Sequence, residues 1–273
     1  MEPRTAELVP DAAPLLERVS GARIRNELIQ VFAEPDPPGA LSRLAAVGAL
    51  EAVAPGLTDG GADFARLLVD LRQSWADWRT AVGAGLTMAP APDPSHGLVL
   101  WLSQHGAAGA RAAGRLRLTR RHARMVEDVA DLAGALGAAS EDEPDPEVGG
   151  EPTGAYAVLA DPGAAPSGVY RALRGYSAET LLLAWLSARD EAARGNIRRY
   201  AWELAGTRTE IGGAELSELG LAPSPSYGAV LRAVLDARLD GRVSTRSEEL
   251  HLARELAARM VAGQDSAPEV DAD

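Results

Sequence analysis

The chain has 273 residues, of which 46% are hydrophobic and only 4% aromatic, and its formal net charge is -12. A hydrophobic core must therefore be filled largely by Ala and Leu, which favour helices over strands. Cysteine is absent, which excludes disulfides, thiolate catalysis and Cys-based zinc sites. The composition predicts an all-α fold, built as a multi-helical array of short amphipathic helices.

Apolar residues at helical spacing predict three helices in the first third of the chain. The first covers 23–33, and the second carries Leu41 and Leu44 and ends near Gly48, a suitable C-terminal residue. The third is longer and covers about 62–82. Its tryptophans, Trp75 and Trp78, belong to the apolar face and are predicted to lie in the core.

The middle of the chain alternates between helices and Gly- or Pro-rich segments. Residues 83–97 are predicted to form a loop, and helices resume at 98–105 and 107–116. Thr119 is placed to cap a helix that runs to about Leu136. The four histidines show no metal-ligand spacing and are expected to be surface or capping residues.

The remaining segments separate into an acidic stretch, a second helical region and a tail. Residues 140–153 are acidic, rich in Pro and Gly, and lack apolar periodicity, which is typical of a flexible linker or inserted loop. Consecutive helices are predicted over 177–190 and 192–204. The last residues, 262–273, are predicted to be disordered.

The first of these helices carries a recognisable pattern, Ser20-x-x-Arg23-Ile24-x-x-Glu27-Leu28. It is followed by a second run at Leu41, Leu44, Gly48, Leu50, Pro55 and Leu57. Together they resemble the neck of class II tRNA nucleotidyltransferases, the CCA-adding enzymes and their bacterial poly(A) polymerase relatives. The resemblance implies that Ser20, Arg23, Arg25 and Glu27 brace the neck rather than react.

A second pattern near the C-terminus resembles the same family. Its matching positions are Ile211, Gly213, Leu216, Gly220, Pro223, Pro225, Gly228 and Leu231, then Gly241, Val243, Thr245, Arg246 and Glu248. Glu215 and Ser224 depart from the family's usual Asp and Gly. The Pro-x-Pro loop leads into a helix that begins near Ser226. The free N–H groups of its first turn can hold an anion, or the loop simply turns one helix onto the next. Ser226, Tyr227 and Gly228 are therefore candidate RNA-binding residues.

The resemblance covers most of the chain and divides it into parts. Residues 1–139 form a neck and body region that binds RNA, and 140–153 form the acidic linker or loop. Residues 154–261 form the C-terminal body and tail region, and 262–273 are the disordered tail.

A cluster of arginines is the best candidate binding feature in the sequence. Its members are Arg111, Arg115, Arg117, Arg120, Arg121 and Arg124. Cations in the first turn of a helix oppose its dipole, so local stability explains them poorly, whereas contacts to RNA phosphates explain them directly. The alternative is a solvated face whose arginines pair with nearby carboxylates, such as Arg124 with Glu127 or Asp128.

No catalytic or metal-binding residues are predicted. The family's reaction needs a strand-borne Asp-x-Asp pair to hold metal ions, and the only such pair here, Asp271 and Asp273, stands at the extreme C-terminus. The catalytic head is therefore expected to be missing, and with it the sites for Mg²⁺ and for CTP or ATP. This chain alone is expected to be inactive, and no cofactor is expected in it.

Two classes of function follow from these observations. In the first, the chain grips the acceptor and T-arm backbone of tRNA for 3′-end processing, with a separately encoded nucleotidyltransferase head as a possible partner. In the second, it is an all-α protein-interaction or scaffold module with an acidic surface. An enzyme with an unrecognised site is a third reading. Without a signal peptide or a long apolar run, the expected location is the cytoplasm, with no membrane and no DNA partner.

Overall fold

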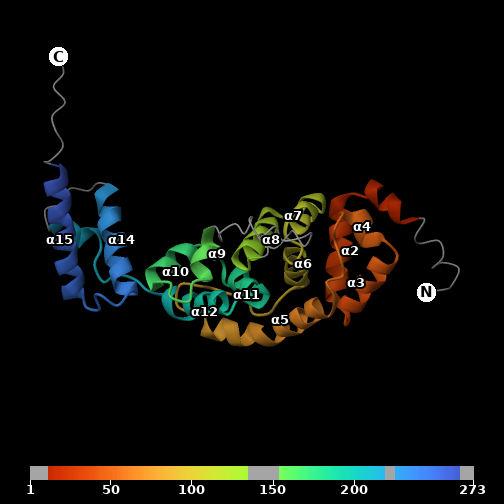
Figure 1. Ribbon diagram of the computed structural model, residues 1–273, viewed down its shortest axis with the longest axis horizontal. Helices are drawn as coiled ribbons and strands as arrows, with labels where there is room; N and C mark the ends of the chain where they lie inside the picture. Colours follow the sequence, from red (N-terminus) through yellow and green to blue (C-terminus); the bar gives the residue numbers. More distant parts are fainter. Residues whose placement is uncertain (1–11, 135–153, 219–224, 265–273) are drawn as a thin grey trace, which may run out of the picture.

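The computed structural model describes residues 12–134, 154–218 and 225–264, and every regular element within these ranges is a helix. The prediction of an all-α array is therefore confirmed. Figure 1 shows the helices arranged along one long axis, with the N-terminal helices at one end and α14 and α15 at the other. Among the described helices, none is both long and apolar enough to cross a membrane.

The N-terminal end consists of four short elements. They are η1 (Ala13–Arg18), α2 (Gly21–Ala33), α3 (Pro37–Ala46) and α4 (Ala49–Val53). The apolar face of α2 is buried at Ile24, Leu28 and Phe32, as its spacing predicts. Gly48 has a φ of 72°, in the left-handed region that glycine adopts without strain, and it ends the helical turn where the sequence placed it.

The next two helices, α5 and α6, differ in how closely they match the prediction. Helix α5 (Gly61–Ala81) runs along one side of the array in Figure 1, with Trp75 and Trp78 only 2% exposed, which confirms that both are core residues. Helix α6 (Pro94–Ser103) begins earlier than predicted, because the side chains of Asp93 and His96 form a capping box around its first turn. The predicted loop therefore ends at Asp93, and His96 is a capping residue.

Helices α7 (Gly106–Arg115) and α8 (Arg120–Leu132) complete the first half of the body. The hydroxyl of Thr119 accepts a hydrogen bond from the backbone N–H of His122 at 3.2 Å, which confirms the predicted N-cap. Helix α8 ends before the predicted Leu136, because Gly134 takes a left-handed conformation with a φ of 73°.

The second half of the body contains α9 (Gly154–Leu159), α10 (Pro166–Leu173), α11 (Ala178–Ser187), α12 (Glu191–Arg199) and a π-helical turn, η2 (Tyr200–Leu204). The helix predicted over 192–204 is thus an α-helix that widens into a π-turn. Such turns are rare and often occur at functional sites. Helix α11 is buried on nearly all sides, since it packs against α5, α8 and α12.

The tail is formed by α13 (Gly213–Glu218), α14 (Pro225–Leu239) and α15 (Arg246–Gln264), the last of which extends into the segment predicted to be disordered. A small hydrophobic cluster joins these helices through Ile211, Leu216, Val230, Val234 and Ala253. A larger cluster joins residues from both sides of the predicted linker, from Ile24 to Ala205, and also includes Leu239 at the end of α14. The linker itself, 140–153, lies outside the described residues.

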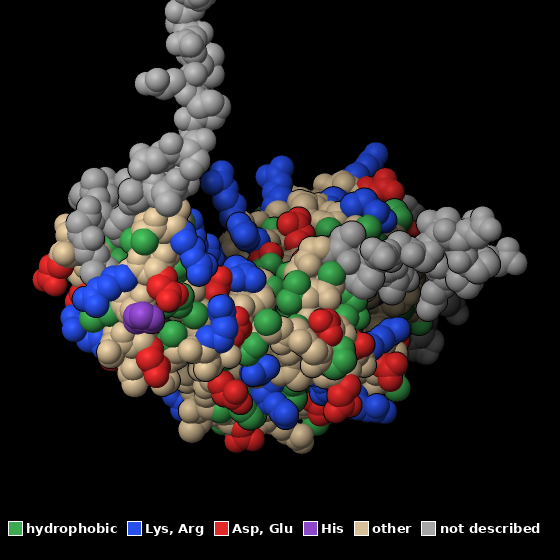
Figure 2. Space-filling view, turned by 60° about the vertical axis from the view of Figure 1, so that its left-hand side comes forward, with side chains coloured by type: hydrophobic (Ala, Val, Ile, Leu, Met, Phe, Trp, Pro, Cys, Tyr) green, Lys and Arg blue, Asp and Glu red, His purple; other side chains and the backbone are tan. Residues whose placement is uncertain are grey.

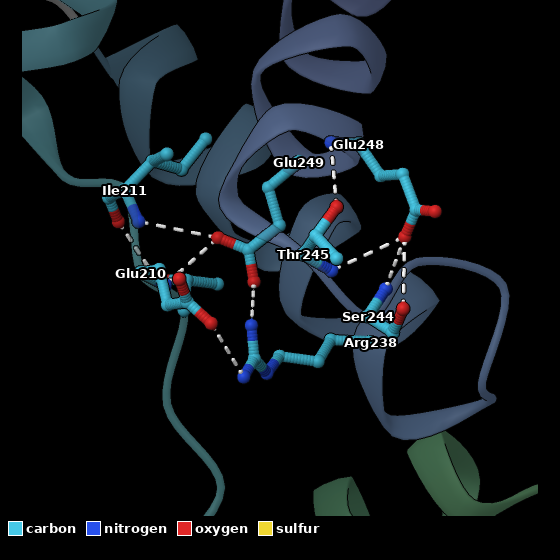
Figure 3. A network of polar contacts seen from close by, with 8 residues as sticks. Glu210, Ile211, Arg238, Ser244, Thr245, Glu248 and Glu249 are labelled. Atoms are coloured by element: carbon cyan, nitrogen blue, oxygen red, sulfur yellow. Dashed lines mark hydrogen bonds and ion pairs between the residues drawn. The ribbon is translucent and has the colours of Figure 1, made fainter.

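A polar network holds the tail together, as Figure 3 shows. The buried carboxylate of Glu249 accepts hydrogen bonds from the backbone N–H groups of Glu210, at 2.7 Å, and Ile211, at 3.2 Å, and it also pairs with Arg238. These contacts fasten the segment that enters α13 to α15 and α14. Because Glu249 is fully buried, its charge depends on these partners for compensation.

The neighbouring Glu248 closes the first turn of α15. Its carboxylate accepts from the backbone N–H groups of Ser244 and Thr245, at 2.7 and 3.1 Å, while its own N–H donates to the Thr245 hydroxyl. The hydrogen bonds from the Ser244 and Thr245 N–H groups lower the pKa of Glu248. Thr245 and Glu248 of the second family pattern thus form a capping box, so their role in the structure is to begin a helix.

Candidate functional site

The predicted arginine cluster divides into exposed and structural members. Arg111, Arg117 and Arg120 are exposed. Arg121 and Arg124 are also exposed but lie near carboxylates, with Arg121 at 3.8 Å from Glu179 and Arg124 at 3.5 Å from Asp128. Both guanidinium groups stay largely exposed beside these more buried carboxylates, so they can still contact a polyanion.

Arg115 has a different environment from the rest of the cluster. One of its guanidinium nitrogens donates to the backbone carbonyls of Leu16 at 3.2 Å and Val19 at 3.1 Å, with Glu17 slightly farther away. These carbonyls lie in the last turn of η1 and just after it, where the chain turns into α2. Arg115 therefore joins the N-terminal end to α7, which leaves its guanidinium less free for an external ligand.

Replacing Arg115 with Met is expected to lower the free energy of unfolding by about 2 kcal/mol, because carbonyls that accept from a charged donor lose their partner. Met retains the apolar stem of the side chain. Urea unfolding measures the change. Arg111→Met on the same helix is the control, and an equal effect of the two substitutions would contradict the role assigned to Arg115.

The predicted neck-bracing residues also differ from one another. Arg25 makes the long-range contact, donating from Nη1 to the Arg117 carbonyl at 2.5 Å. Among the described residues, Arg117 is the non-glycine residue with a positive φ, 50°, which is a strained backbone conformation. The hydrogen bond from Arg25 therefore fixes a strained turn between α7 and α8. Ser20 occupies the N-cap position of α2, and Arg23 and Glu27 are exposed beside a groove on that helix.

A groove made of two adjoining hollows lies beside α10, and its smaller hollow reaches α14. The larger measures about 680 Å³ and the smaller about 380 Å³, and Tyr170 and Arg174 line both. The arginines of this groove are Arg121, Arg174 and Arg208 in the larger hollow, and Arg171, Arg174 and Arg232 in the smaller. We call it the arginine groove.

Cationic side chains outnumber carboxylates in the arginine groove. The carboxylates that line it are Glu179 and Asp236, and Asp236 pairs with Arg171. Arg208 is held in place by hydrogen bonds from its guanidinium to the carbonyls of Ala205, at 3.0 Å, and Thr207, at 2.8 Å. Figure 2 shows arginine side chains standing around a hollow on this side of the molecule. The local charge is positive although the chain as a whole is acidic.

Three tyrosines, Tyr170, Tyr176 and Tyr200, also line the larger hollow. Burial and the neighbouring Tyr170 raise the pKa of Tyr200 to about 12, against the opposing influence of Arg208 and Arg174. Burial, followed by the nearby Asp128 and Asp131, also raises the pKa of Tyr176. Both phenols are neutral at physiological pH, and Tyr170 and Tyr176 are partly exposed where Tyr200 is buried.

Only part of this groove was predictable from the sequence. Arg121 belongs to the predicted cluster, and Gly228 lies on α14 close to Arg232. Ser226 and Tyr227 belong to α14 as well, but their side chains lie outside the described residues, as does the 219–224 segment before them. The groove's other arginines come from α10, α14 and the turn after η2, which only folding brings together. Tyr170, Arg171 and Arg174, close together at the end of one helix, were the available signal.

Comparison with known proteins relates the chain to RNA-processing enzymes. Residues 1–60 match the family described as the probable RNA and SrmB-binding site of polymerase A. The chain is 38% identical over 91 residues to the A-adding tRNA nucleotidyltransferase of Geobacter sulfurreducens, covering 33% of this chain and 10% of that protein. It is 33% identical over 78 residues to the CC-adding enzyme of Thermus thermophilus, covering 24% of this chain and 18% of that protein.

The fold has close counterparts among solved structures. The Thermotoga maritima CCA-adding enzyme complexed with tRNA matches with a TM-score of 0.61 at 21% identity, covering 95% of this chain and 57% of that one. A CCA-adding enzyme complexed with ATP matches with a TM-score of 0.59 at 21% identity, covering 99% and 57%. The chain thus spans little more than half the length of these structures and far less of the curated relatives. The resemblance seen in the sequence is confirmed: the chain is a helical body and tail region related to that of the class II tRNA nucleotidyltransferases.

Proposed function

We propose that this chain binds tRNA and that the arginine groove contacts the phosphate backbone of the acceptor and T-arm. The observation that carries the proposal is the gathering of Arg121, Arg174 and Arg208 in one concave surface. Support comes from the matching RNA-binding family and from a structural neighbour complexed with tRNA. Phosphate contacts supply most of the affinity in such interfaces and position the nucleic acid without reading its sequence.

The acidic net charge is compatible with this proposal. Phosphate contact depends on the local field, which falls off within about 10 Å at ordinary salt. The groove carries its own excess of arginine, and Arg117 and Arg120 are exposed as well. RNA helices are recognised by their shape and backbone, so a surface of this kind suits a folded RNA.

The nucleotidyltransferase chemistry belongs, in this proposal, to a catalytic head that would bring Mg²⁺ and CTP or ATP. A groove of about 540 Å³ at the N-terminal end offers an apolar contact surface for such a domain, lined by Leu16, Val19, Ile24, Leu28, Val31 and Leu44. A separately encoded head would bind there and gain tRNA 3′-end addition when mixed with this chain. A radiolabelled CTP and ATP incorporation assay with and without the chain measures that gain.

The first test is tRNA binding across a salt titration, with Arg120→Glu/Arg121→Glu as the variant. Both side chains are exposed, but Arg121 lies 3.8 Å from the buried carboxylate of Glu179, so far-ultraviolet circular dichroism checks that the variant is folded. We expect the logarithm of the binding constant to fall linearly with the logarithm of salt concentration, and the slope of the variant to be shallower by about 2, near 0.9 for each lost phosphate contact.

The control is Arg66→Glu/Arg72→Glu on α5, which makes the same change of net charge at exposed positions that do not line the groove. Affinity that is insensitive to salt, or an equal loss in both variants, would count against the groove. Absence of tRNA binding at low salt would refute the proposal and favour the alternative of a protein-interaction module.

One observation favours that alternative. Trp202 of η2 is 39% exposed, and the guanidinium of Arg198 lies 5.5 Å from the centre of its ring. The ring of the buried Trp78 meets that of Trp202 edge to face, with the centroids 5.9 Å apart. Exposed tryptophan beside arginine is typical of protein interfaces. A stable complex with a protein unrelated to nucleotidyltransferases, retained after nuclease treatment, would identify this second function.

A further inference from the structure

We propose that the larger hollow of the arginine groove accepts one unstacked RNA nucleotide, with the phosphate on Arg174 and Arg208 and the base against the tyrosine rings. This inference rests on the proposed RNA binding and deepens it, because it assigns a ligand to one part of the groove. It distinguishes this hollow from the surrounding surface, which contacts backbone alone.

The cations of the hollow are placed for a phosphate. Arg174 follows the end of α10 and Arg208 follows η2, and both are exposed along their guanidinium groups while facing the same space. Arg208 is already fixed by its hydrogen bonds to Ala205 and Thr207, so little conformational entropy is lost when it binds an anion. Arg121 adds a third positive charge at the rim, 3.8 Å from Glu179.

The tyrosines point to a base as well as a phosphate. Tyr200 lines the hollow with only 4% of its surface exposed. Tyr170 lies beside it with ring centroids 5.8 Å apart, Tyr176 stands on the adjoining turn, and both are partly exposed.

Paired RNA cannot use this wall. In a duplex the faces of the bases are covered by their neighbours, and a protein reaches only phosphates, riboses and groove edges. Aromatic side chains instead stack on bases of single-stranded segments, loops and ends. A volume of about 680 Å³ is also within the range of pockets that bury a small ligand, which suits a nucleotide better than a flat stretch of backbone.

The walls of the hollow are rigid. The loop between α5 and α6 is held by the Gly83 N–H, which donates to the Ala201 carbonyl at 2.7 Å, and by the Ala89 N–H, which donates to Glu179 at 3.2 Å. At Gly85, a Cβ atom would stand 2.2 Å from the carbonyl oxygen of Ala205, so the loop packs directly on the backbone after η2. The hollow is therefore formed before any ligand arrives.

The experiment uses the full chain and a short single-stranded oligoribonucleotide that carries 2-aminopurine at its centre. Fluorescence anisotropy gives the affinity, and quenching of 2-aminopurine reports stacking. Tyr176→Leu is expected to weaken binding about tenfold and to abolish most of the quenching, because stacking on one aromatic ring is lost. A blunt, fully paired RNA duplex should bind the variant and the unchanged chain with equal affinity.

Tyr200→Phe keeps the ring and removes the hydroxyl. It is expected to weaken binding of the oligoribonucleotide a few-fold without loss of 2-aminopurine quenching. Tyr156→Leu is the control, since this partly buried tyrosine on α9 does not line the hollow. Far-ultraviolet circular dichroism checks that each variant is folded. Arg174→Gln, at an exposed position, gives a second variant that does not disturb the core and should weaken both RNAs.

Unchanged affinity and quenching in folded Tyr176→Leu would overturn the nucleotide site. Competition by inorganic phosphate as effective as competition by a nucleoside monophosphate would also overturn it, because the base would then contribute nothing. Salt-sensitive tRNA binding that persists in either case would leave the proposed function standing. Failure of every RNA to bind at low salt would remove the proposed function itself.

Discussion

Replacing Arg174 and Arg208 together with Glu is expected to weaken tRNA binding by about 100-fold at low salt. Both arginines face the larger hollow, and each one that contacts a phosphate makes a charge-assisted hydrogen bond. Such bonds contribute about 1.5–3 kcal/mol each, and 1.4 kcal/mol corresponds to a factor of ten. Filter binding at several salt concentrations measures the loss, which should shrink as salt rises because screening weakens the lost contacts.

The Arg66→Glu/Arg72→Glu variant is again the matched comparison, with the same change in charge on exposed positions of α5. It should alter affinity only through the long-range field, by a few-fold at most. A loss confined to Arg174→Glu/Arg208→Glu assigns the affinity to the groove. A comparable loss in both would mean that tRNA responds to total charge and that the groove has no special part.

Replacing Arg238 with Met is expected to destabilise the tail by about 3 kcal/mol, because the buried carboxylate of Glu249 would lose its cation. Two backbone N–H groups would still donate to Glu249, but they carry no full charge. The pKa of Arg238 is raised, first by its hydrogen bond to Glu249 and then by that to Glu210, which agrees with a strong pairing in the folded state.

The distribution of tryptophan allows this change to be localised. All five tryptophans precede Ile211, so their fluorescence reports the larger hydrophobic cluster, while hydrogen exchange of α14 and α15 reports the tail. Arg238→Met should raise exchange in the tail without moving the fluorescence transition. Arg242→Met, which removes an exposed arginine 3.5 Å from Asp240, should have little effect on either. Equal effects of the two variants would contradict the importance of Glu249.

The helices were largely predictable because their apolar residues repeat with a helical period. Trp75, Trp78 and the face of α2 are buried as that period requires, and the Thr119 cap was evident from residue type. The ends of helices were less predictable, since they depend on local geometry. The start of α6 depends on the His96 side chain, and the end of α8 depends on the backbone conformation of Gly134.

The candidate site was less predictable than the fold. Arg121 was found because several arginines occur close together in sequence, whereas Arg174 and Arg208 are isolated in sequence and meet only in space. The π-turn at η2 has no sequence signal of its own, yet it places Tyr200 and Ala205 on the wall of the hollow. Arg115 is the opposite case. The sequence grouped it with candidate binding residues, whereas in the structure its guanidinium donates hydrogen bonds to backbone carbonyls.

Every cation that lines the arginine groove is a guanidinium, and the chain contains no lysine. Guanidinium groups stay protonated beyond pH 12, whereas amines begin to lose their charge near pH 10. The positive charge of these side chains is therefore constant throughout the range in which the protein is folded. Nor can it be reduced by acetylation, which acts on amines. Affinity for a polyanion should accordingly respond to ionic strength, and neither alkalinity nor lysine modification should remove the cations that hold an RNA.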